Sequence, residues 1–116
     1  MNIMNLHVNE IKLEDNKVKI YTEEPQMDVT ATGTMVVDSD HMQFVYLLDD
    51  GDFHHLRFVQ ETWPMLKQYQ DKDWYLYGTL QLDNFKEELQ FLLENIEGNY
   101  NYGKEFTESV EHAFEL

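Results

Sequence analysis

The centre of this chain is the stretch Val36–Leu66, VVDSDHMQFVYLLDDGDFHHLRFVQETWPML, in which two apolar runs flank the dipeptide Asp50-Gly51. Asp-Gly favours a two-residue type I′ turn because both central residues must take a positive φ. The sequence therefore predicts a β-hairpin that pairs Asp49 with Asp52. In this register both faces of the hairpin are largely apolar, so we expect it to lie centrally in a sheet, with each side at least partly covered.

The residues before this hairpin alternate in a way that predicts further strands. Apolar side chains recur at every second position from Met4, and the alternation slips at Asn9-Glu10, which indicates a β-bulge. Asp and Asn residues between two alternating runs are typical of a turn. The predicted elements are strands over 4–13, 17–22 and 35–37, a turn over 14–16 and a loop or crossover over 23–33.

After the hairpin the spacing of apolar residues changes to that of helices. Thr62 followed by Pro64 is typical of a helix N-terminus. The most regular helical pattern starts at Asn84, where Glu87 three residues later predicts a capping box, and it ends at Gly98, a natural stop. The remaining predicted elements are a strand over 74–82, in which Gly78 indicates a bulge, and a last helix from about residue 104.

Strands thus come first along the chain and the longer helices come last. This order favours an α+β fold. We predict an antiparallel sheet of about five to six strands with one short helix and two longer ones, the two longer ones C-terminal. The 116 residues are enough for one domain and too few for two, so we predict a single α+β domain over residues 1–116.

The charge balance limits the classes of partner. The net charge is −15, with 23 acidic residues against 8 basic ones. This argues against direct binding to nucleic acid or to an anionic membrane, and it favours a basic protein surface as partner. The chain has no Cys, no apolar run long enough to span a bilayer and no signal-peptide pattern, so we expect a cytoplasmic protein, as a monomer or a homodimer.

Histidine and carboxylate side chains offer one alternative reading. His41 or His55, together with Asp38 and Asp40, would form a small metal- or ligand-binding module like that of an enzyme, although the spacing does not match a calcium loop. The sequence contains no nucleophile elbow and no glycine-rich phosphate loop. A non-enzymatic protein is therefore favoured over an enzyme, and we predict no catalytic residue, no metal and no cofactor.

The aromatic side chains are more numerous than a core of this size can bury fully. Tyr and Trp are enriched at interfaces, and a basic side chain of a partner can stack on a ring while it pairs with a carboxylate at the rim. We therefore predict a non-enzymatic binding or regulatory protein that engages a basic partner through an aromatic and acidic surface. The predicted contact residues are Asp49, Asp50, Asp52, Glu61, Trp63, Tyr100 and Tyr102.

Four segments carry a resemblance to known proteins. VDSD (37–40), LDDG (48–51), FVQETWPML (58–66) and NYGKEF (101–106), in this order, resemble a family of small acidic proteins of bacilli and staphylococci. The similarity runs from about Asn9 to Glu115. The family has no assigned function, so the resemblance implies a cytoplasmic protein of Gram-positive bacteria and supplies no catalytic residues.

Overall fold

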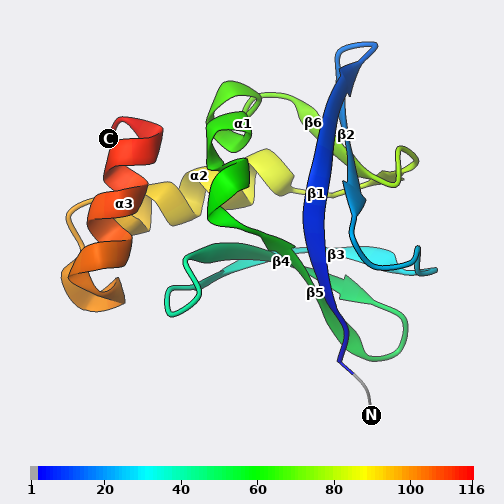
Figure 1. Cartoon of the computed structure of the whole chain (residues 1–116), viewed down its shortest axis with the longest axis horizontal. Coiled ribbons are helices and arrows are strands. Elements are labelled where there is room, and N and C mark those ends of the chain that lie inside the picture. Colours follow the sequence, from blue (N-terminus) through cyan, green and yellow to red (C-terminus); the bar gives the residue numbers. More distant parts are fainter. Residues whose placement is uncertain (1–2) are drawn as a thin grey trace.

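The computed structural model describes residues 3–116, and within them it contains seven strands and three α-helices. Figure 1 shows a curved sheet with the helices gathered on one side of the long strand β1. The strands are β1 (Asn5–Glu14), β2 (Lys17–Thr22), β3 (Thr30–Asp38), β4 (Gln43–Asp49), β5 (Phe53–Phe58), β6 (Asp73–Leu76) and β7 (Leu80–Gln81). The helices are α1 (Trp63–Gln68), α2 (Phe85–Ile96) and α3 (Lys104–Phe114), with short 3₁₀ turns η1 (Gln60–Thr62) and η2 (Tyr100–Tyr102).

The sheet is mixed, with the strand order β3-β4-β5-β1-β2-β6-β7. The α+β class is confirmed, whereas the predicted antiparallel sheet of five to six strands is wrong. β1 pairs with β5 in parallel, and β2 pairs with β6 in parallel. Alternation of apolar residues identifies a strand but not its neighbour, so it could not reveal these two long-range pairings. The predicted strand over 74–82 is a hairpin instead, since Tyr77 and Gly78 both take positive φ and reverse the chain.

Strand β1 joins the two halves of the sheet. Its first residues, Asn5–His7, pair with β5, and from Val8 onward it pairs with β2. The register shifts between Val8 and Glu10, which confirms the bulge predicted at this point. A bulge bends a strand and increases its twist. β1 can therefore belong to both halves of the sheet, which Figure 1 shows at an angle to each other.

The central hairpin forms, but its register differs by one residue from the prediction. Asp49 pairs with Phe53, so the loop has three residues, Asp50–Asp52. A shift of one residue moves each side chain of a strand to the opposite face. One face is consequently buried throughout and the other is partly exposed, in place of two apolar faces. The buried face carries Phe44, Tyr46, Leu48, His54, Leu56 and Phe58.

The helices cover this buried face with aromatic side chains. Phe85, the first residue of α2, stacks on Trp74 at 4.8 Å between ring centroids and lies 5.4 Å from the ring of Phe58. The predicted helix over α2 and its stop at Gly98, which has φ 70°, are confirmed. The predicted capping box is absent, because Asn84 takes a left-handed φ and its side chain makes no cap hydrogen bond.

Candidate functional site

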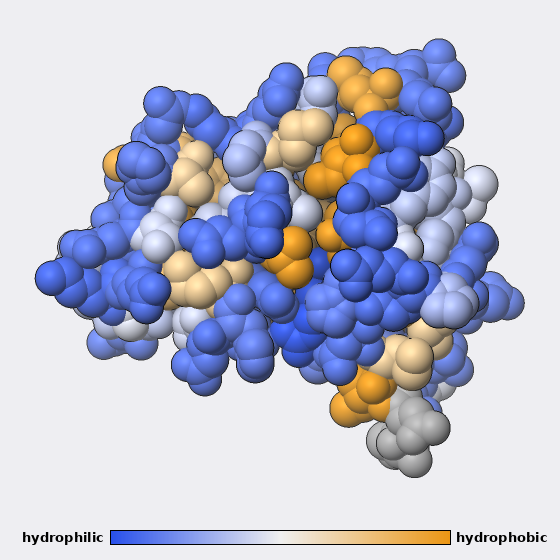
Figure 2. Space-filling view, in the orientation of Figure 1, coloured by the Kyte–Doolittle hydropathy of each residue, from blue (hydrophilic) through white to orange (hydrophobic). Residues whose placement is uncertain are grey.

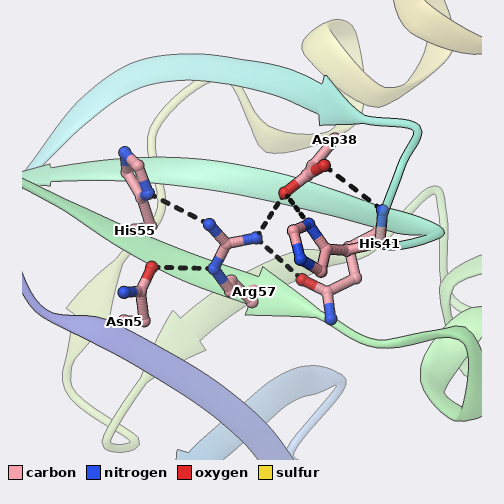
Figure 3. Close-up of polar contacts among 6 residues, drawn as sticks. Asn5, Asp38, His41, His55 and Arg57 are labelled. Atoms are coloured by element: carbon pink, nitrogen blue, oxygen red, sulfur yellow. Dashed lines mark hydrogen bonds and ion pairs between the residues drawn. The ribbon is translucent and has the colours of Figure 1, made fainter.

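The partly exposed face of the sheet carries a polar network around Arg57 of β5 (Figure 3). The Nη1 of Arg57 donates to Oδ2 of Asp38 at 2.8 Å and to Oε1 of Gln43 at 2.9 Å. Its Nε donates to Oδ1 of Asn5 at 2.8 Å, and its Nη2 lies 3.3 Å from Nδ1 of His55. One guanidinium thus links β1, β3, β4 and β5.

Asp38 also contacts His41, so part of the predicted histidine and aspartate cluster exists. The Nδ1 of His41 lies 2.9 Å from Oδ2 of Asp38. Burial opposes ionisation of Asp38, but hydrogen bonds from Arg57 and His41 lower the pKa of its carboxyl below the ordinary value. Burial and the charge of Arg57 lower the pKa of His55. Because Arg57 already balances the carboxylate of Asp38, a cation bound there would have to displace the guanidinium.

Substitution of Arg57 by Met tests whether this network stabilises the fold. The change leaves Asp38, which is only partly exposed, without its cation, and we expect a loss of about 2 kcal/mol in the free energy of unfolding. Urea denaturation measures it. The control is Lys12→Met at an exposed residue whose nearest carboxylate oxygen lies 3.9 Å away, for which we expect a change below about 0.5 kcal/mol. Equal stabilities of the two variants would contradict the prediction.

The aspartate tip, which we define as Asp49, Asp50 and Asp52, forms hydrogen bonds within its own hairpin. Asp49 accepts a hydrogen bond from the Gly51 N–H at 2.8 Å. The Oδ1 of Asp50 lies 2.7 Å from Nε2 of the buried His54, and this contact is the main reason that the pKa of Asp50 is lowered. The Nδ1 of His54 accepts from the Met4 N–H at 2.9 Å, so the Nε2 carries the proton that Asp50 accepts. The tip thus holds the start of β1 against β5.

The other predicted contact residues do not form one surface with this tip. Trp63 is only 1% exposed, so its placement on the surface is wrong; it lies in the core because η1 turns it toward the rings of Phe44 and Phe106. Tyr100 is 55% exposed, and Tyr102 packs partly on Phe106. In Figure 1 the β4–β5 turn and α3 lie at opposite ends of the molecule.

A wide groove lies between α1 and α3. Four glutamates of α3 and of the residue after it line this groove, and its floor includes Pro64, Ala113 and the side of Trp63. The four are Glu105, Glu108, Glu111 and Glu115. The sequence shows acidic residues along this helix but not the groove, because the groove depends on the contact of α1 with α3. The spacing of the glutamates is the one signal that could have indicated it.

The four glutamates differ in their partners. Glu115 pairs with Lys67 of α1, and Glu111 accepts the Gly98 N–H at 2.8 Å. Within residues 3–116, the side chains of Glu105 and Glu108 make no hydrogen bond or ion pair. The Nε1 of Trp63, which also lines the groove, is buried without a hydrogen-bond partner among the same residues. The groove therefore offers two carboxylates that are not engaged within residues 3–116.

The surface around these sites is predominantly hydrophilic. Figure 2 shows apolar residues on one face only as small separate groups, one of them beside the N-terminus, where Ile3 is 54% exposed. Among the described helices, none has the length and apolar character needed to cross a bilayer.

Comparison with known proteins gives consistent results over nearly the whole chain. Residues 6–114 match the model of a family of unknown function, UPF0738. A UPF0738 protein of Staphylococcus haemolyticus is 48% identical over 97% of this chain and 99% of its own, and one of Staphylococcus epidermidis is 50% identical with the same coverage. No solved structure matches. The match to bacterial relatives of this length confirms the resemblance seen in the sequence, and the chain belongs to the UPF0738 family.

Proposed function

We propose that the protein is a non-enzymatic cytoplasmic binding protein that engages a basic segment of a partner protein. The observation that carries the proposal is the groove between α1 and α3, in which glutamates border an apolar floor. Lys and Arg combine an apolar stem with a cationic head, so they fit a surface of this composition. The net charge of −15 would also attract a basic partner over a distance and speed its association.

The two available carboxylates give the groove its binding capacity. Glu105 and Glu108 lie on exposed positions of α3 and make no ion pair within residues 3–116, so a partner's Lys or Arg would not have to displace an existing ion pair. Glu111 and Glu115 instead have contacts that shape the groove.

In the proposed function, the predicted contact residue Tyr100 extends the surface of the groove. Tyr100 is exposed and lies in η2, a few residues before α3, so its ring is available to a segment that runs past the groove. The aspartate tip at the other end of the molecule would be a separate contact for a larger partner. Against the enzyme alternative stands the network of Asp38, His41 and Arg57, whose charges are balanced within the chain.

Double charge reversal, Glu105→Lys with Glu108→Lys, tests this function. Each variant serves as bait in a native lysate of a staphylococcus, and the captured proteins are quantified by mass spectrometry. We expect the wild type to retain a basic protein. The variant should capture at least about tenfold less of this protein, because two charge pairs are lost. Retention of the same basic protein should also fall steeply at ~0.5 M salt, because exposed charges are screened.

The matched control is Glu10→Lys with Glu14→Lys on β1. It makes the same change in net charge at two exposed glutamates away from the groove, so it should capture the partner as the wild type does. An equal loss in both variants would mean that only overall charge matters. Captured proteins that are acidic or neutral would contradict the proposed partner class, and titration of the purified partner by calorimetry would give the affinity directly.

A further inference from the structure

A second concave site lies where β1 meets the loop after β2. This cleft, of about 530 Å³, has His7, Glu23 and Glu24 on one side, and His41 and Glu61 also line it. The five residues come from β1, the β2–β3 loop, the β3–β4 turn and η1. Among the described residues that line the cleft, none is Lys or Arg, so two imidazoles and three carboxylates meet there without an opposing cation.

The donor atoms of three of these residues are close together. His7, Glu23 and Glu24 can each offer one ligand atom so that all three lie within 4.8 Å of one another. Ligands of one zinc ion lie about 2.0–2.2 Å from it, so any two of them are within about 4.4 Å. Rotation of the exposed side chain of Glu23, with small adjustments of His7 and Glu24, would bring the three atoms into one coordination shell.

His7 and Glu24 are already held in position. The backbone N–H of His7 donates to Oε1 of Glu24 at 2.6 Å, and its Nδ1 lies 2.7 Å from Oε2. Burial opposes ionisation of Glu24, but these hydrogen bonds lower the pKa of its carboxyl. The Glu23 N–H donates to the carbonyl oxygen of His7 at 3.0 Å, which fixes the backbone of the loop on β1. The side chain of Glu23 remains exposed, so one carboxylate is free to rotate toward an ion.

We propose that His7, Glu23 and Glu24 form a site for a divalent transition-metal ion, best suited to zinc, in the cleft that His41 and Glu61 also line. One imidazole with two carboxylates is a donor set that zinc accepts, whereas calcium needs six to eight oxygen ligands. A metal ion would replace the proton shared by the Nδ1 of His7 and the Oε2 of Glu24, and that proton would be released to solvent, while the backbone N–H of His7 still holds the Oε1 of Glu24. The site goes beyond the proposed partner binding, because it shares no carboxylate with the groove between α1 and α3.

Calorimetric titration of the whole protein with zinc chloride tests this site. We expect one zinc ion per chain and a rise in melting temperature on binding. Glu23→Gln should lower the affinity at least about tenfold, since it replaces a charged ligand by a neutral amide. Because the side chain of Glu23 has no hydrogen-bond partner within residues 3–116, this variant should keep the fold, which circular dichroism verifies. His7→Asn should weaken binding further.

Two controls separate this site from other carboxylates and histidines. His112→Asn removes an exposed imidazole of α3 and should bind zinc as the wild type does. Glu105→Lys with Glu108→Lys should also bind zinc normally, so that failure of one proposal is distinguishable from failure of the other. Absence of zinc binding, equal affinity of the wild type and the Glu23→Gln and His7→Asn variants, or a loss confined to His112→Asn would overturn the site.

Discussion

Substitution of Trp63 by Ala is expected to lower the free energy of unfolding by about 3–5 kcal/mol, the range for large aromatic residues removed from a core. The indole is 1% exposed, and its ring lies within 6.1 Å, between centroids, of those of Phe44, Phe106 and Phe114. Its removal would open a cavity at the point where α1, α3 and β4 meet. Urea denaturation followed by tyrosine and tryptophan fluorescence and by circular dichroism measures the change.

The matched variant Trp63→Phe separates the ring from its N–H group. It keeps most of the aromatic contacts and removes a buried donor that has no partner among the described residues, so no hydrogen bond is lost. We therefore expect a loss less than about half that of Trp63→Ala. Similar losses in the two variants would show that the indole N–H does form an important contact, and would contradict the unsatisfied state of this donor.

A pH-dependent loss of stability in alkali is the second large expected effect. Tyr46 is fully buried; its hydroxyl donates to the carbonyl oxygen of Asp83 at 2.7 Å and accepts the Gly33 N–H at 3.0 Å. Burial raises the pKa of Tyr46 from the ordinary 10.0 to about 12, since the phenolate would lose its hydration. A difference of one in pKa corresponds to about 1.4 kcal/mol, so the effect amounts to roughly 3 kcal/mol.

The direction of the change in stability follows from the number of protons bound by the folded and by the unfolded chain. Between about pH 10 and pH 12 the folded chain keeps the Tyr46 proton and the unfolded chain loses it, so stability falls as pH rises through this window. The comparison with Tyr46→Phe removes the contributions of other tyrosines and of lysines. We expect the wild type to lose roughly 3 kcal/mol more than this variant across the window. Equal losses of stability in the wild type and in Tyr46→Phe, measured by urea denaturation, would indicate that the phenol of Tyr46 is in contact with water and would contradict the prediction.

Local patterns in the sequence predicted the elements that depend on neighbouring residues. The bulge after Val8, the end of α2 at Gly98 and the α+β class all follow from alternation, helical spacing and glycine. The register of the central hairpin could not be predicted in this way, because Asp50-Gly51 fits loops of two or three residues. The choice depends on which face the helices cover, and the three-residue loop is the one that places Leu56 and Phe58 of β5 on the same buried face as Tyr46 of β4.

The candidate sites were predicted less well because they depend on contacts between distant segments. Trp63 was expected at the surface from its residue type, and only the packing of α1 against α3 places it in the core. The sequence around His7 did not by itself indicate a metal site. Extension of the predicted N-terminal hairpin by one pair would have set it beside Glu23 and Glu24, since Val8 pairs with Thr22. An isolated histidine on a strand usually indicates nothing more than a half-buried position.

The double role of β1 has a consequence for biosynthesis. The β1–β2 hairpin leaves the ribosome before β5 and β6, which pair with its two outer edges and are translated some thirty or more residues later. Until then both edges present free backbone groups that can recruit strands of other nascent chains. Charged side chains of both signs on this hairpin, among them Glu10, Lys12 and Lys19, make such edge pairing less favourable during that interval. The charged residues of this hairpin therefore bear on how the chain folds during synthesis as well as on its folded surface.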